Sequence, residues 1–239
     1  MTEQFSRSQK LHENLGRIIS QTKPGERLLT EPELARQLGV SRATLREAMR
    51  TFETQGLIRR RQGSGTFVVH PPSVLESGLE VLESIETLAK RSGLQVKMGE
   101  LRVETRPATA EEAEALELAI GARIIHLSRV ITTEERPAAF LVDILPEDVL
   151  PSKDLQIGFT GSVLDLLLRR GDPPLGTSRT EINAVPATTE VSRALGIQRG
   201  DVLLRFTALL YTAQGRAIDY SFSYFLPGYF RFHVVRRIG

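Results

Sequence analysis

The chain has 239 residues, a formal charge of only +2, and 41% apolar residues. This length is sufficient for two domains with hydrophobic cores of ordinary size. The absence of cysteine excludes a disulfide framework and a thiolate metal site. No apolar run approaches the length of a membrane span, and the first ten residues are polar. We therefore expect a protein of the cytoplasm with no membrane partner.

The charge is divided unevenly along the chain. Residues 1–70 contain 12 Lys and Arg against 7 Asp and Glu, a net charge of +5. Residues 71–239 contain 19 and 22, a net charge of −3. A basic first part joined to a mildly acidic second part is typical of a protein whose first part meets nucleic-acid phosphates.

The first part contains the pattern of a helix-turn-helix. Thr30 and Glu33 form a capping-box pattern ahead of an apolar stripe, and Gly39 ends that helix. Ser41 is a good N-cap for a second helix. A short helix, a three-residue turn and a second helix have the spacing at which the second helix enters the major groove.

The second helix has two faces at helical spacing. Its inner face is apolar, with Leu45, Ala48, Met49 and Phe52. Its outer face carries cationic and hydroxyl groups, the kinds that contact base edges and phosphate oxygens: Arg42, Thr44, Arg46 and Arg50.

A glycine-rich hairpin is predicted after this helix. Gly56 closes the helix, and two strand-like runs, 57–61 and 66–69, are joined by Gln62-Gly63-Ser64-Gly65. The first strand carries three successive cations that suit phosphates or a neighbouring minor groove: Arg59, Arg60 and Arg61. The sequence thus predicts a winged helix.

Residues 8–69 resemble the DNA-binding domain of the GntR family of bacterial transcription regulators. The shared motifs are Pro24-Gly25-Glu26-Arg27-Leu28, Leu34-Ala35, Val40-Ser41-Arg42, Leu45-Arg46-Glu47-Ala48, Gly56-Leu57 and 63–68. The resemblance implies DNA contacts from Glu31, Ser41, Arg42, Thr44, Arg46 and Gly65. The helix face and the wing add Arg50, Arg61 and Gly63. The family usually carries Arg where this chain has Pro32, so we do not assume the family's common operator sequence.

Two consecutive prolines, Pro71-Pro72, mark a predicted domain boundary. We assign residues 1–70 to the winged helix, 71–81 to a linker and 82–239 to a second domain. Apolar residues at helical spacing predict one helix from 74 to 91 that packs on the second domain: Leu75, Leu79, Leu82, Ile85 and Leu88.

The second domain contains an internal repeat with an offset of 79 residues. Ala115-Leu116 matches Ala194-Leu195, Gly121 matches Gly200, and each copy reads helix, glycine, strand, turn, strand. We expect an α+β domain in which both hairpins share one antiparallel sheet with helices on one side. Further strands are predicted at 97–106, 179–184 and 230–236. Chance similarity is the alternative explanation of the repeat.

From Leu82 to the C-terminus the chain resembles the UTRA ligand-binding domain of the HutC branch of GntR regulators, which has a chorismate-lyase-like fold. The shared motifs are Leu127-Ser128-Arg129, 137–146, Gly161-Ser162-Val163-Leu164 and Ile218-Asp219-Tyr220-Ser221. The resemblance implies a pocket for a small metabolite, often an anion, whose binding changes operator affinity. Many relatives carry a second Arg, an acidic residue and a Tyr at three positions that are here Ile131, Leu141 and Leu164.

These replacements change the expected effector, because aliphatic side chains offer no hydrogen bonds to a sugar or phosphate. The polar candidates that remain are Arg129, Ser162, Asp219 and Tyr224. We expect an effector with at most one anionic group, met by Arg129, and a larger apolar body. Alternatively, Ile131 and Leu141 face the core and Arg129 lies on the surface of its strand.

The sequence offers little for catalysis. The four histidines lack metal-ligand spacing, and Gly161-Ser162 lacks the second glycine of a nucleophile elbow. We predict no catalytic residue, metal site or cofactor. The expected function is a ligand-responsive transcription regulator, most simply a repressor, which binds double-stranded operator DNA as a homodimer. The alternatives are an architectural DNA-binding protein without an effector and a chorismate-lyase-like enzyme fused to a DNA-binding domain.

Overall fold

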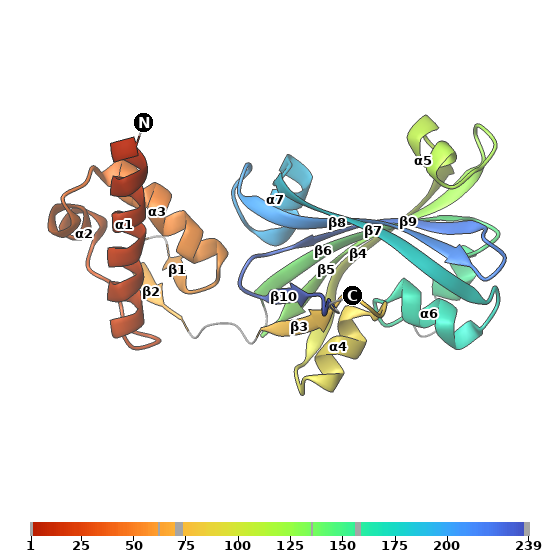
Figure 1. Ribbon diagram of the computed structural model, residues 1–239, viewed down its shortest axis with the longest axis horizontal. Coiled ribbons are helices and arrows are strands. Elements are labelled where there is room, and N and C mark those ends of the chain that lie inside the picture. Colours follow the sequence, from red (N-terminus) through yellow and green to blue (C-terminus); the bar gives the residue numbers. More distant parts are fainter. Residues whose placement is uncertain (1, 62, 70–73, 135, 156–158, 237–239) are drawn as a thin grey trace. The chain divides into compact units, whose positions relative to one another are not determined.

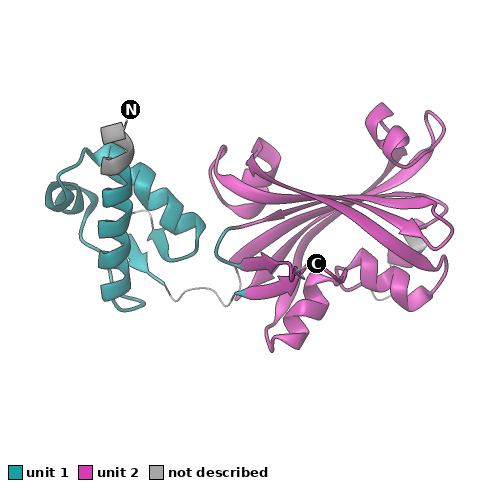
Figure 2. Cartoon of the chain, viewed as in Figure 1, with its two compact units in different colours: residues 1–74, 227–229 teal, residues 75–226, 230–239 magenta. Residues whose placement is uncertain are grey.

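The computed structural model describes residues 2–61, 63–69, 74–134, 136–155 and 159–236. The chain forms two compact units, Met1–Val74 with Pro227–Tyr229 and Leu75–Leu226 with Phe230–Gly239 (Figure 2). No helix within the described ranges is both long enough and apolar enough to cross a bilayer. The predicted Pro71-Pro72 connector lies outside the described residues, as does Gln62 of the predicted turn.

The first unit is a winged helix. It consists of α1 (Thr2–Gln21), α2 (Glu31–Leu38), α3 (Arg42–Thr54), β1 (Ile58–Arg61) and β2 (Gly65–Val68). Thr30 and Glu33 form the predicted capping box, and the antiparallel β1–β2 hairpin forms the wing. The core joins apolar residues of the three helices, including Leu15, Leu34, Leu45 and Met49. The predicted helix-turn-helix and its hairpin are confirmed.

The second unit is built on a six-stranded antiparallel sheet with the order β4-β5-β6-β9-β8-β7. Its strands are β4 (Val96–Pro107), β5 (Arg123–Thr133), β6 (Arg136–Pro146), β7 (Leu175–Pro186), β8 (Val202–Thr212) and β9 (Ala217–Phe225). Helix α5 (Ala110–Ala115) lies between β4 and β5 in the chain, and α7 (Thr189–Leu195) lies between β7 and β8. Both copies of the repeat therefore have the same element order, and β6 and β9 pair at the centre of the sheet.

Helices lie on both faces of this sheet, whereas we expected them on one side (Figure 1). On one face, Val163 and Leu167 of α6 (Val163–Arg170) pack in a cluster with Leu127 of β5. On the other, the Tyr220 hydroxyl of β9 donates to Glu111 of α5 at 3.1 Å. Neighbouring residues of β5 point to opposite faces and both are buried, so each face needs its own cover.

The predicted helix from 74 to 91 is wrong in its first half. Leu75–Gly78 forms β3, which pairs in parallel with β10 (Phe230–His233). Only Ile85–Arg91 is helical, as α4, capped by Ser84. Leu75 and Ser77 are buried while Glu76 is exposed, an alternation with the period of a strand. The helical spacing of the leucines was misleading because Leu79 and Leu82 are exposed.

Candidate DNA-binding surface and effector site

The outer face of α3 carries the predicted DNA-binding row. Arg42, Thr44 and Arg46 are exposed, and Arg50 is half-buried. The Arg46 Nε lies 2.6 Å from Oε2 of Glu31, the first residue of α2. The structure thus brings together two of the predicted DNA-binding residues that lie 15 positions apart.

The N-terminus of α3 is closed by the predicted cap. The Ser41 Oγ accepts a hydrogen bond from the Thr44 backbone N–H at 3.1 Å and lies 2.8 Å from the Thr44 Oγ1. Both side chains are exposed. Ser41 therefore fixes the start of the helix and presents its hydroxyl group at the same surface as Arg42.

The wing adds further cations. Gly65 pairs with Arg61 across the hairpin and has a φ of 110°, a conformation that favours glycine. A Cβ at Gly65 would lie 2.5 Å from the Arg27 Nε, so the exposed Arg27 covers this glycine. The Arg61 guanidinium lies 5.3 Å from the centre of the Phe67 ring. Arg27 was not among the predicted DNA-binding residues, although it lies in the turn motif at residues 24–28.

The three successive wing arginines do not share one role. Arg60 Nη2 donates to the Arg46 carbonyl oxygen at 3.1 Å, and its Nε lies 3.5 Å from Glu53 Oε2. Its backbone N–H also donates to Glu53. Arg60 therefore ties the wing to α3, while Arg59 and Arg61 are exposed.

The polar centre of the second unit is Arg129 of β5. Its side chain is only 4% exposed, so the alternative that it lies on the strand surface is wrong. The guanidinium donates to Asp143 of β6 and to the Gly161 carbonyl oxygen. Asp219 of β9 lies beside Asp143, and burial together with the Asp143 charge raises the pKa of Asp219 well above its usual range.

The N-termini of α4 and α6 meet beside this centre. The Ser162 Oγ accepts from the Asp165 backbone N–H at 2.9 Å as the cap of α6. The Asp165 carboxylate in turn accepts from the Ser84 Oγ at 2.7 Å. Burial raises the pKa of Glu86, which lies next to Gly161. The structure thus gathers Arg129, Ser162 and Asp219 with four polar residues that sequence reasoning missed: Ser84, Glu86, Asp143 and Asp165.

The aliphatic candidates belong to the core. Ile131 and Leu141 lie in one apolar cluster with Phe225, as the alternative predicted. Leu164 is half-buried against a neighbouring apolar cluster. These three side chains therefore pack with other apolar side chains beside the polar centre.

Tyr224 does not join the predicted set. Its register partner on β6 is Phe140, whose ring lies 6.2 Å away, centre to centre. The paired part of β9 is regular, so Tyr224 and Asp219, five residues apart, point to opposite faces of the sheet. The charged groups that act on the Tyr224 hydroxyl lie on that other face: Arg205 of β8 and Glu190 of α7.

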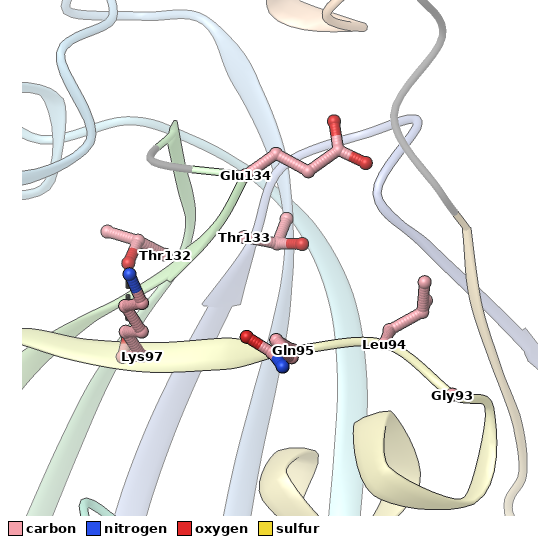
Figure 3. A pocket seen from close by; sticks show the side chains of 7 residues that line it. All are labelled: Gly93, Leu94, Gln95, Lys97, Thr132, Thr133 and Glu134. Atoms are coloured by element: carbon pink, nitrogen blue, oxygen red, sulfur yellow. Dashed lines mark hydrogen bonds between the residues drawn. The ribbon is translucent and has the colours of Figure 1, made fainter.

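A separate hollow lies where β4 begins and β5 ends (Figure 3). It has a volume of about 260 Å³ and is lined by Gly93, Leu94, Gln95, Lys97, Thr132, Thr133 and Glu134. The Thr132 hydroxyl donates to the Lys97 carbonyl oxygen at 3.1 Å. None of the predicted effector residues lines this hollow, so the candidate effector site remains the cluster around Arg129.

A winged helix with a cationic recognition helix, joined to a separate α+β unit with a buried polar centre, defines a DNA-binding regulator with a sensor domain. Residues 9–68 match the model of the bacterial regulatory proteins of the gntR family, and residues 91–231 match the UTRA domain. The chain therefore belongs to the GntR family, in the HutC branch with a C-terminal UTRA domain. It is a ligand-responsive transcription regulator and not an enzyme.

The chain is similar to known regulators over most of its length. The transcriptional repressor NagR of Bacillus subtilis is 28% identical over 198 residues, 83% of this chain and 80% of that protein. The regulator Rv0792c of Mycobacterium tuberculosis is 30% identical over 222 residues, 91% and 80% of the two chains. The histidine utilization repressor of Pseudomonas putida is 29% identical over 181 residues, 76% and 71%. The crystal structure of PhnF from Mycobacterium smegmatis shares the fold, with a TM-score of 0.65, 22% identity, and coverage of 96% of this chain and 100% of that one.

Proposed function

We propose that this regulator is a cytoplasmic repressor that binds a near-palindromic operator as a homodimer and changes its affinity when a small metabolite binds. The exposed row Arg42, Thr44 and Arg46 on α3 carries the proposal. The names of NagR and of the Pseudomonas putida relative, both repressors, support the direction of control. In this proposal residues 1–70 bind DNA, 71–81 link, and 82–239 bind the effector and dimerise.

The DNA contacts are divided between the helix and the wing. Arg46, oriented by Glu31, reads a base edge in the major groove, and Arg42 and Thr44 contact bases or phosphates beside it. Ser41 adds a DNA contact at the N-terminus of α3, and Arg50 adds one near the middle of the helix. The wing residues Arg61, Gly63 and Gly65, with Arg27, meet the phosphates or the minor groove next to the helix.

A homodimer follows from the size of the DNA contact. One winged helix covers a half-site, and specific affinity normally needs two copies on related half-sites. The sheet face between α5 and α7 suits self-association because it presents half-buried apolar and aromatic side chains: Leu209, Tyr220, Phe222 and Tyr224. A pair of such faces about a two-fold axis is the expected arrangement.

The effector site is the cluster around Arg129, Ser162 and Asp219. These groups come from β5, the start of α6 and β9, elements that are far apart in the sequence. A ligand that contacts all three would fix the α6 cap against the central strands. Its effect on DNA binding is limited by its preference for one arrangement of the two DNA-binding units over another.

The test is a DNA selection followed by titration. Fragments retained by the purified chain give the operator, and fluorescence anisotropy then measures affinity with and without a panel of metabolites. We expect salt-sensitive binding that Arg46→Ala weakens and that one class of metabolite changes. The matched control Arg199→Ala removes an exposed cation from the second unit and should leave operator affinity unchanged. No retention of any duplex contradicts the proposal, and tight binding that no metabolite changes favours the architectural alternative.

A further inference from the structure

The charge of Arg129 is already met inside the protein. Asp143 accepts from its Nη1 and the Gly161 carbonyl oxygen accepts from its Nε. An anionic effector placed beside Arg129 would therefore also lie beside the Asp143 carboxylate, and the two negative charges would repel each other. Separating Asp143 from Arg129 would leave the Asp143 carboxylate buried without a cation, which is strongly unfavourable.

Two further carboxyl groups next to this pair have an oxygen that lacks a donor. Asp219 is buried, with only 6% of its surface exposed. Its Oδ1 is buried and accepts no hydrogen bond from the part of the chain that the structure describes. The same holds, for the described residues, of the buried Oε1 of Glu86. Buried acceptors without donors are rare in folded proteins, so each of them needs an explanation.

The surroundings of both groups are acidic. Asp219 is affected by the charge of Asp143 and a hydrogen bond shared with it, and also by Arg129 and the Ile144 backbone N–H. Glu86 is affected by its own backbone N–H and by Arg129, Asp165 and Asp143. Burial raises the pKa of each carboxyl group, because a buried negative charge without a partner is unfavourable, and a nearby positive charge acts in the opposite direction. Among these described residues, one guanidinium, already paired with Asp143, lies among four carboxyl groups, so the cluster favours a positive charge over a phosphate or carboxylate.

We propose that the effector presents a protonated nitrogen, an amine or a guanidine, to Asp219 and Glu86, with the Arg129–Asp143 pair kept intact beneath it. This inference rests on the proposed function, since it assigns a chemical class to the same effector. An ammonium or guanidinium group supplies several donors together with a positive charge, which is what carboxyl oxygens without donors need. It replaces our sequence-based expectation of an anionic group met by Arg129.

The test uses the full-length chain and three pools of pure metabolites, each compound at the same concentration: cationic amines and guanidines, neutral polyols, and anionic phosphates and carboxylates. Thermal unfolding reports binding, and operator anisotropy reports the response. We expect a compound of the cationic pool to raise the Tm by about 3 °C or more. The variants Asp219→Asn and Glu86→Gln should each weaken this compound about tenfold or more. Glu100→Gln, which removes an exposed carboxylate from β4, is the matched control and should leave binding unchanged.

The outcomes separate the inference from the proposed function. Stabilisation by the anionic or neutral pool alone overturns the inference and leaves the proposed function standing. Stabilisation by a cation without any change in operator affinity supports the charge of the site and contradicts the proposed function. A lower Tm of ligand-free Asp219→Asn, combined with unchanged ligand affinity, makes Asp219 a structural residue and overturns its assigned role. No stabilisation by any pool contradicts both.

Discussion

The side chain of Arg46 forms an ion pair with Glu31 in the free protein, and we propose that it contacts DNA in the complex. Its Nε lies 2.6 Å from the Glu31 carboxylate, and both residues stand at the proposed DNA surface. We predict that Arg46→Ala weakens operator binding by about 1 to 3 kcal/mol and relaxes specificity at one base pair. Anisotropy titrations against operators with single base-pair changes measure both effects. An equal loss on every sequence would assign Arg46 to a phosphate.

Asp219 gives the effector site a pH dependence. Its pKa is raised in the free protein, and the charged groups around the site are Arg129, Asp143, Glu86 and Asp165. A bound cation lowers that pKa, so binding at a pH below the pKa of the free site releases a proton. Affinity for a permanently charged effector should therefore rise with pH, by about tenfold per unit at most, until the pH passes the pKa of the free site. Calorimetry in buffers of different ionisation enthalpy measures the released proton, and a buffer-independent heat contradicts this mechanism.

Single residues were predicted well where local chemistry decides their place. Ser41 and Thr30 cap their helices as the sequence indicates, because a cap depends on residues within one turn. Asp219 meets Asp143 through the pairing of β6 with β9, which are far apart in the sequence, and Asp143 was not among the predicted site residues. Tyr224 was misplaced because its face of the sheet depends on the register of β9, which no motif shows.

Among the elements, α5 depends on one ion pair that can be tested directly. Arg106 and Thr109 hold Glu112 through hydrogen bonds of 2.7 and 2.8 Å, and the Arg106 guanidinium is the main cause that lowers the pKa of Glu112 to about 2. Because this pKa lies below the ordinary value of 4.5, the stabilisation is complete above pH 4.5 and is lost as the pH falls toward 2. We predict that Glu112→Gln lowers the stability of the second unit by about 1.5 to 3 kcal/mol at neutral pH.

Thermal or urea unfolding across this pH range tests the prediction. The difference between the wild-type chain and Glu112→Gln should shrink as the pH falls. Glu114→Gln, which removes an exposed carboxylate from the same helix, is the control and should leave stability nearly unchanged. A difference that stays constant at every pH would show that the substitution acts through packing.

Helices and strands were predictable where the spacing of apolar residues agrees with cap and turn residues at the ends of the element. The helix-turn-helix, the glycine hairpin and both copies of the repeat carry caps and turns at their ends, and all appear in the structure. The stretch from 74 to 84 ends in Ser84, the cap of α4, but nothing in it indicates a strand. Its leucines fit a helix, yet Leu75–Gly78 pairs with β10, which follows about 150 residues later, and this long-range pairing outweighs local preference.

At the scale of the whole molecule, the two halves of the chain carry opposite net charges that suit different roles. A net charge of +5 in residues 1–70 suits DNA, and −3 in residues 71–239 suits a domain that avoids it. In the proposed homodimer, coupling between them acts through the arrangement of the two DNA-binding units, because an effector that binds every arrangement equally shifts nothing.

The proposed dimer interface can be tested by a single substitution. Phe222 stands on the sheet face between α5 and α7, half-buried in one chain, and a Glu there would bury a charge in the proposed interface. We predict that Phe222→Glu produces a monomer in sedimentation equilibrium and weakens operator binding at least about 100-fold, because only one half-site remains engaged by each chain. Leu168→Glu, on α6 at the opposite face, changes an apolar residue that is already 56% exposed and should preserve both properties. If Phe222→Glu remains dimeric with its fold intact, self-association uses another surface, whereas a monomer that keeps full operator affinity would remove the need for two copies.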